Sequence, residues 1–239
     1  MIPVTDAVRA RTFPFVNIAI IIASTLVFIY EVSISAAALD RFFFDYAVVP
    51  AELYDWWKSP SGVSEPLTVS SAAFLHGGWL HLGGNMLFLW VFGDNVEDAL
   101  GHFRYAAFYL IAAAVASATQ VAFDTDSIVP VVGASGAIAG VLAGYLVLYP
   151  RATVGIVIPF LFFLGALPVP AFVLIIFWFL MQLFTGFAEI GNTAASSGIA
   201  VWAHIGGFIA GLTIMLAARP FIPRRSLSQV RTRGQVKLW

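Results

Sequence analysis

Cysteine is absent from the 239 residues of this chain, and charged residues are scarce, at 10% of the sequence. The absence of cysteine excludes disulfide bonds, a cysteine nucleophile and thiolate metal sites. Soluble domains contain about 25% charged residues. The low charge content, together with 60% hydrophobic residues, therefore indicates a membrane protein.

Long stretches without any charged residue divide the chain. They run over residues 13–30, 105–123, 132–149, 152–188 and 190–218. About 18 to 20 apolar residues cross a hydrocarbon core of about 30 Å, so these stretches are long enough for membrane-spanning helices. We expect one membrane domain at residues 13–218, between a short cytoplasmic tail at residues 1–12 and a basic cytoplasmic tail at residues 219–239.

Six helices account for these stretches. We expect spans at residues 13–30, 80–101, 105–123, 135–149, 171–187 and 198–218. With six spans, most arginine and lysine residues lie on one side, which the positive-inside rule assigns to the cytoplasm. A seventh span at residues 153–166 would put the basic tail outside, and Pro159 interrupts this short segment. The expected fold class is therefore an all-α integral membrane bundle of six helices with both termini cytoplasmic.

The segment of residues 31–79 differs from the spans, because charged and aromatic residues alternate in it. Its aromatic runs, such as Trp56-Trp57, suit the membrane–water interface, where amphipathic rings collect. We expect this first loop to form short amphipathic helices in the headgroup layer.

A serine between glycines opens the fourth expected span, in Gly133-Ala134-Ser135-Gly136. Glycine permits a tight turn and the close approach of another group. The free N–H groups at a helix start can receive negative charge. The alternative is that Ser135 only caps the helix, a position that serine favours. About 15 residues make a helix of about 22 Å, so we expect the serine end to lie below the membrane surface.

Two polar side chains share one face of the second expected span. His81 and Asn85 are four residues apart, which places them on the same side of a helix. Their N–H groups can point to one position, as an oxyanion hole requires. His76 precedes the helix breaker Gly77-Gly78 and is expected to cap or fold over this face. The alternative is a hydrogen-bonded pair with a structural role only.

Small residues recur every four positions on two of the expected spans. They are Gly136, Gly140 and Gly144 on the fourth span and Ala203, Gly207 and Gly211 on the sixth. Such stripes let membrane helices approach closely. Ser135 and His204 lie at corresponding ends of the stripes, on helices expected to run parallel. The hydroxyl and the imidazole should then come within the ~2.6–3.2 Å that nucleophile activation requires, although packing alone also explains the stripes.

The remaining polar residues within the spans have a simpler interpretation. We assign Asn17, Gln120 and Gln182 to hydrogen bonds between helices. The sequence contains no His-Glu-x-x-His pattern and no carboxylate suited to a metal inside the expected spans, and His102 is expected in a cytoplasmic loop. We expect no metal and no cofactor.

Three motifs lie in order on the second, fourth and sixth expected spans. They are His76-x4-His81-x3-Asn85, Gly133-x-Ser135-Gly136 and His204-x2-Gly207-x3-Gly211. Together they resemble the motifs of the rhomboid family of intramembrane serine proteases. The resemblance covers about residues 66–218 and includes the flanking segments 74–81 and 93–101.

The resemblance implies a catalytic dyad without an acidic third member. Ser135 would be the nucleophile, and His204 the general base that then protonates the leaving amine. His81, Asn85 and the Ser135 backbone N–H would hold the oxyanion, with His76 in the same polar cluster. The fifth span and the loop after it, at about residues 168–198, would admit a substrate helix from the lipid.

Some positions carry a structural role or depart from the family pattern. Glu97 and Gly101 match positions that are structural in the family. Ala139 stands where well-known members have an aromatic residue stacked on the histidine, so we expect other contacts to orient His204. Trp56-Trp57-Lys58 replaces a Trp-Arg pair in the first loop.

We therefore expect an intramembrane serine endopeptidase in a prokaryotic cell membrane. Its partners would be the lipid bilayer and single-span membrane protein substrates, and no nucleic acid. Hydrolysis needs water, so a cavity open to the outer face is expected beside Ser135, bounded by the second, fourth and sixth spans. One alternative is a catalytically inactive rhomboid-like protein that binds membrane helices. Another is a small transporter or channel, although the two halves of the sequence show no repeat.

Overall fold

The computed structural model describes residues 1–158, 165–189 and 200–222. Three features expected from the sequence lie partly or wholly outside this part. They are the last part of the segment expected to admit a substrate helix, at residues 190–198, the greater part of the basic tail, at residues 223–239, and residues 159–164 of the apolar segment before the fifth span.

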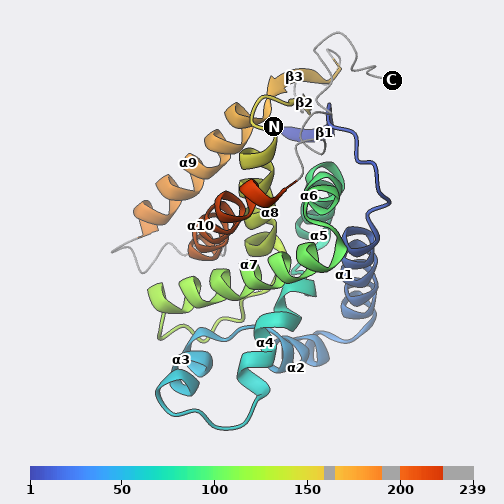
Figure 1. The fold of residues 1–239 in the computed structure, drawn as a ribbon. Coiled ribbons are helices and arrows are strands. Elements are labelled where there is room, and N and C mark those ends of the chain that lie inside the picture. Colours follow the sequence, from blue (N-terminus) through green and yellow to red (C-terminus); the bar gives the residue numbers. More distant parts are fainter. Residues whose placement is uncertain (159–164, 190–199, 223–239) are drawn as a thin grey trace.

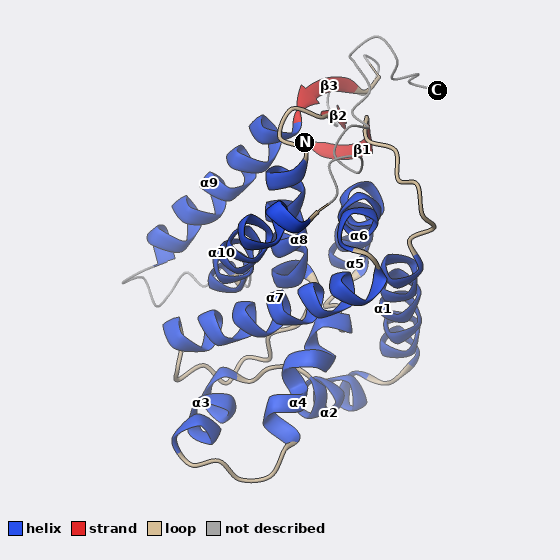
Figure 2. Cartoon of the chain, in the orientation of Figure 1, coloured by secondary structure: helices blue, strands red, loops and turns tan. Residues whose placement is uncertain are grey.

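The described chain is mostly helical, as Figure 1 and Figure 2 show. The long helices are α1 (Phe15–Ser33), α7 (His102–Phe123), α8 (Ser135–Leu148), α9 (Ala171–Glu189) and α10 (Val201–Ala218). A further helical unit consists of α5 (Trp79–Phe88), a π-helical turn at Leu89–Gly93, and α6 (Asp94–Leu100).

Four described helices are long and apolar enough to cross a membrane. They run over Phe15–Ser33, His102–Phe123, Ala171–Ala188 and Val201–Phe221. The helix α8 is apolar but has 14 residues, and the π-helical turn interrupts α5 and α6. The structure is therefore that of a multi-pass helical membrane protein, and the number of six spans stays a prediction.

The first loop forms short helices, as expected. They are α2 (Ala36–Tyr46), α3 (Pro50–Lys58), α4 (Ser64–Ser71) and a 3-10 turn at Ala72–Phe74. Figure 1 shows α2, α3 and α4 grouped at one end of the molecule. Their position in the headgroup layer stays a prediction.

A small β-sheet lies at the other end of the molecule, beside the N-terminus (Figure 2). Its strands are β1 (Ile2–Asp6), β2 (Thr153–Val157) and β3 (Leu167–Pro170), paired antiparallel in that order. The all-α expectation was wrong here. The N-terminal residues are more than a tail, and the short apolar segment after α8 starts as a strand. Its β-branched residues suit a strand, but a short apolar run does not distinguish strand from helix.

The helices α8 and α10 pack along their glycine stripes, and α8 is almost entirely buried. A Cβ added to Gly140 would lie 3.1 Å from the Gly207 carbonyl oxygen, and one added to Gly144 would lie 3.1 Å from Met215 Cε. Contacts therefore advance along both helices in the same direction. The expectation of two parallel helices in register is confirmed.

Candidate active site

Ser135 and His204 meet where the two packed helices begin. Ser135 is the first residue of α8, and His204 lies in the first turn of α10. Ser135 Oγ is 2.7 Å from His204 Nε2, a hydrogen-bonding distance. The imidazole is buried, with 8% of its surface exposed, whereas the serine is partly exposed. The hydroxyl thus faces both an acceptor nitrogen and an open side.

The line of small residues along which α8 and α10 pack, which we call the seam, explains why Ser135 and His204 lie so close together. A Cβ on Gly136 would lie 2.5 Å from Ala116 Cβ and 3.4 Å from the Ala203 carbonyl oxygen. Any larger residue beside Ser135 would push α8 away from α7 and α10. Helix α10 is further held by Gln120 of α7, whose Oε1 accepts a hydrogen bond from the Ala203 N–H at 3.2 Å. The interhelical role expected for Gln120 is confirmed.

The other nitrogen of the imidazole faces an amide on α9. His204 Nδ1 lies 2.8 Å from Gln182 Oε1. A carbonyl oxygen only accepts hydrogen bonds, so this contact favours the tautomer with the proton on Nδ1 and a lone pair on Nε2 toward the Ser135 hydroxyl. The Trp178 ring also flanks the imidazole, with 5.8 Å between ring centroids. These contacts orient His204 in the place of the aromatic residue that Ala139 replaces.

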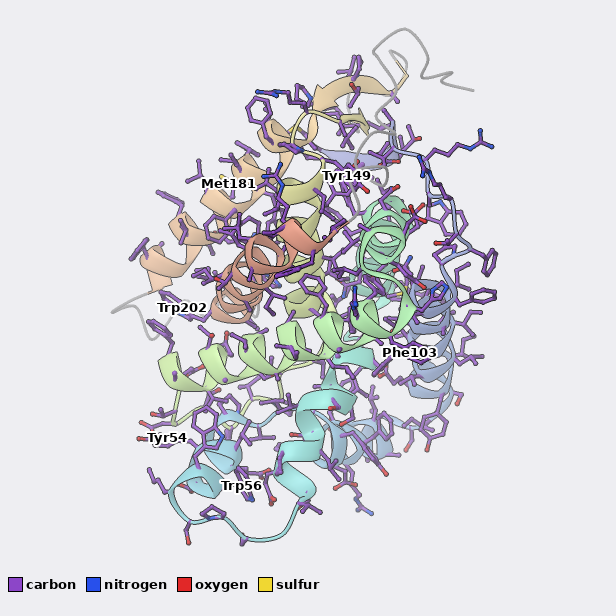
Figure 3. All side chains as sticks on the ribbon, viewed as in Figure 1. Tyr54, Trp56, Phe103, Tyr149, Met181 and Trp202 are labelled. Atoms are coloured by element: carbon purple, nitrogen blue, oxygen red, sulfur yellow. The ribbon has the colours of Figure 1, made fainter. Side chains whose placement is uncertain are left out.

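Gln182 was assigned from the sequence to an interhelical hydrogen bond, and that bond exists. Sequence reasoning missed that its partner is the candidate catalytic histidine. No local pattern reveals this contact, because it depends on how α9 lies against α10. Figure 3 marks two neighbours of this region, Met181 on α9 and Trp202 on α10.

His81 and Asn85 point toward the backbone just before Ser135, as the structure of Gly133 shows. A Cβ on Gly133 would lie 2.7 Å from His81 Nε2 and 3.7 Å from Asn85 Nδ2. Gly133 also has a φ of 124°, which favours glycine. The ring nitrogen of His81 and the amide nitrogen of Asn85 therefore converge on one point. Asn85 Nδ2 is buried without a hydrogen-bond partner among the described residues.

His76 folds back against the same face, as expected. Its ring lies 5.2 Å from that of His81, its Nδ1 is 3.1 Å from the Phe74 carbonyl oxygen, and its Nε2 has no partner among the described residues. Its backbone N–H faces both carboxyl oxygens of Glu31, each at 3.3 Å. Sequence reasoning missed Glu31, which is buried at the end of α1 and directly follows the expected first span.

A small cavity lies beside the serine. Its volume is about 20 Å³, and its lining includes Ser135, Gly133 and small residues of α7 and α10. A volume above roughly 10–15 Å³ holds one water molecule, so this space has room for about one. The cavity was expected between the second, fourth and sixth spans. It is bounded instead by α7, α8, α10 and the end of the first loop, because small side chains on α7 leave the space open.

Glu97 and its partners form a second polar cluster, which we call the Glu97 network. Glu97 accepts hydrogen bonds from the backbone N–H groups of Val16 and Asn17, at 3.0 and 2.7 Å, and pairs with His102 Nδ1 at 2.5 Å. Asn17 donates to the Leu89 carbonyl oxygen and accepts from the Tyr105 hydroxyl. The structural roles expected for Glu97 and Asn17 are confirmed. No cluster of three potential metal ligands occurs among the described residues.

The apolar helices and the Ser135–His204 pair define a multi-pass membrane protein with a serine–histidine pair inside its helical bundle. The family model described as "Rhomboid domain" matches residues 63–221, and the chain belongs to the rhomboid family.

Curated relatives are similar to the chain over different lengths. Rhomboid protease AarA of Providencia stuartii is 27% identical over 220 residues, which cover 84% of this chain and 71% of that protein. The mitochondrial Rhomboid protein 1 of Saccharomyces cerevisiae is 32% identical over 38% of this chain and 28% of its own length. RHOMBOID-like protein 5 of Arabidopsis thaliana is 38% identical over 32% of this chain and 25% of its own length. The chain thus matches less than a third of the latter two proteins.

Proposed function

We propose that the protein is an intramembrane serine endopeptidase that hydrolyses peptide bonds of single-span membrane proteins. The observation that carries the proposal is the 2.7 Å contact between Ser135 Oγ and His204 Nε2. With its Nδ1 facing an acceptor, the imidazole takes the serine proton at Nε2 as the hydroxyl attacks the scissile carbonyl carbon. The same Nε2 then delivers that proton to the leaving amine.

Charge on the attacked carbonyl oxygen needs donors that are already in position. His81 Nε2, Asn85 Nδ2 and the Ser135 backbone N–H, which opens a helix and lacks an intrahelical acceptor, are our candidates. The convergence of the two side-chain nitrogens on Gly133, two residues before the serine, supports this role. His76 contributes to the polarity of the cluster through its unpartnered Nε2.

Hydrolysis of the acyl-enzyme requires water next to the serine. The cavity of about 20 Å³ beside Ser135 has room for one such molecule. His204 does not line this cavity, so the water has to move to the side of Ser135 that faces the imidazole before it reacts. His204 removes a proton from this water, the oxygen attacks the acyl carbon, and the Ser135 hydroxyl is restored. The free acid and the amine are the two products.

The membrane arrangement is part of the proposal. The domain at residues 13–218 crosses the bilayer six times, with Ser135 toward the outer face and with the tails at residues 1–12 and 219–239 in the cytoplasm. The excess of arginine and lysine on the proposed inner side supports this orientation. We propose a prokaryotic cell membrane, because the bacterial relative matches 84% of the chain and the yeast mitochondrial one 38%.

The test is cleavage of a helical substrate by the purified protein in liposomes. Ser135→Ala and His204→Ala are each expected to abolish cleavage and labelling by a fluorophosphonate probe. Ser24 is a matched control, since it is a buried serine on α1 whose Oγ has no partner among the described residues. Ser24→Ala should retain both activities. If the wild-type protein showed no cleavage and no labelling, the result would indicate an inactive rhomboid-like protein that binds membrane helices.

A further inference from the structure

Gln182 occupies the position beside the imidazole that a carboxylate holds in other serine hydrolases. Its Oε1 is 2.8 Å from His204 Nδ1, on the opposite side of the ring from Ser135. No carboxylate is hydrogen-bonded to His204 among the described residues. The apolar stretches that contribute α7, α8 and α9 contain no Asp, Glu, Lys or Arg between residues 105 and 123, 132 and 149, or 152 and 188.

An acceptor at Nδ1 decides which tautomer of a neutral imidazole is present. When Nδ1 carries the proton, Nε2 is free to accept the serine proton. In the opposite tautomer, Nε2–H would point at the hydroxyl and the ring would not act as a base. A neutral amide selects the tautomer as a carboxylate does, but adds no negative charge to stabilise the imidazolium.

The bond also links His204 to a helix at the edge of the bundle. In the apolar segment of α9, 22% of the residues are buried, against 50% in that of α10. The correct tautomer therefore depends on α9 remaining packed against α10, with Gln182 and Trp178 facing the ring.

We propose that Gln182 is a positioning residue that holds His204 as the Nδ1–H tautomer, so that packing of α9 completes the Ser135–His204 pair. This inference rests on the proposed serine protease function. Gln182 itself touches no reacting atom and acts through the histidine.

The experiment compares two glutamines that bond to the first turn of α10. Gln182→Met removes the acceptor while keeping the length of the side chain, and Gln120→Met does the same to the bond with the Ala203 N–H. Removing the outer hydrogen-bond partner of a metal-binding histidine typically costs about 10–100-fold, and we take the same range for His204. We expect kcat to fall about 10–100-fold in Gln182→Met with KM unchanged, and Gln182→Glu to restore most of it. Gln120→Met should keep kcat while lowering stability.

The spectroscopic measurement is 15N NMR of the imidazole of His204 in the full-length protein. The wild type should show a protonated Nδ1 and an unprotonated Nε2, and Gln182→Met a mixture of tautomers. A wild-type spectrum with the proton on Nε2 would overturn the inference, even where Gln182→Met does not fold. So would a fall in kcat without a change in tautomer, or an unchanged kcat. Failure of the protease function itself would instead appear as cleavage that survives Ser135→Ala.

Discussion

The candidate active site and the Glu97 network use the same kinds of side chain in different ways. In the Glu97 network, the carboxyl group, the Asn17 amide and the Tyr105 hydroxyl all have partners. In the candidate active site, buried nitrogens of His76 and Asn85 have none among the described residues. The first cluster ties α1, α6 and α7 together, whereas the second leaves the Asn85 amide donor without a partner near Ser135.

This difference has an energetic meaning. A buried polar group without a partner costs about 1–3 kcal/mol, and such groups are retained mainly where function needs them. Within a membrane bundle, a polar residue alone therefore says little about its role. An unpartnered atom alone does not decide it either, since Ser24 Oγ, Asn95 Oδ1 and Tyr109 Oη also lack partners among the described residues. What distinguishes the candidate active site is that its unpartnered amide lies beside the backbone that leads into Ser135.

Glu97→Ala should give the largest effect, and on stability alone. Two backbone N–H groups and the His102 ring would lose their acceptor, which costs about 3–5 kcal/mol in total. Asp98 is a matched control, because it also accepts three hydrogen bonds, from Arg11 and Thr12, but at an exposed site. Asp98→Ala should cost less than about 1 kcal/mol. Denaturant unfolding measures the stability of both variants, and cleavage per folded molecule measures their specific activity. A fall in the specific activity of Glu97→Ala that matches its loss of stability would remove the distinction between the two clusters.

Asn85→Ala should show the opposite pattern. The loss of one oxyanion donor lowers kcat by about 10²–10³-fold, or about 3–4 kcal/mol. Stability should be unchanged or higher, because Asn85 Nδ2 has no partner to lose among the described residues. Asn17→Ala, which breaks two buried hydrogen bonds, should lower stability and leave kcat unchanged. The hypothesis fails if Asn85→Ala destabilises the protein while kcat is retained.

The central contacts of the candidate active site could be predicted from the sequence. The four-residue period of Gly136, Gly140 and Gly144, matched on α10, was enough to predict that Ser135 and His204 lie together, because a helical period determines which residues share a face. In the same way, the four-residue spacing of His81 and Asn85 was enough to predict that the two side chains share one helix face.

The rest depends on contacts that no local pattern encodes. The Gln182–His204 bond depends on how α9 packs against α10. The pairing of β1 with β2 joins Ile2 to Val157 across most of the chain. Glu31 lies at the end of a span, where a carboxylate normally reaches water, but tertiary packing buries it against His76.

The glycine contacts provide a third, smaller test. A Cβ on Gly207 would collide with the Gly136 carbonyl oxygen in the seam of the candidate active site, and one on Gly93 would lie 2.6 Å from Asn17 Cγ in the Glu97 network. Each substitution by alanine should cost about 1–3 kcal/mol. Gly207→Ala should also reduce kcat, and Gly93→Ala should not. Gly84 of α5 has open space around it, so Gly84→Ala is the control, with stability unchanged or raised by up to about 1 kcal/mol. Equal effects of Gly207→Ala and Gly93→Ala on kcat would contradict the functional separation of the candidate active site from the Glu97 network.

The smallest effect, about 1 kcal/mol for each pH unit, should come from Asp6, a paired carboxyl whose pKa is raised by burial. Its Oδ2 accepts hydrogen bonds from Tyr145, at the far end of α8 from Ser135, at 2.5 Å, and from Asn95 at 3.0 Å. Burial raises the pKa of Asp6 from 3.8 to about 8, although the Tyr145 bond opposes the rise. Between these two values the folded protein holds a proton that the unfolded chain releases. The contribution of Asp6 to stability is therefore complete below pH 3.8 and declines as the pH rises toward 8, by at most ~1.4 kcal/mol per pH unit.

Asp6→Asn keeps the shape of the side chain and removes the proton equilibrium. The variant should therefore lose less stability than the wild type between pH 5.5 and 7.5, by about 1 kcal/mol per pH unit. Unfolding measured at both pH values decides this, and parallel pH curves for the two proteins would show that Asp6 is ionised in the folded state.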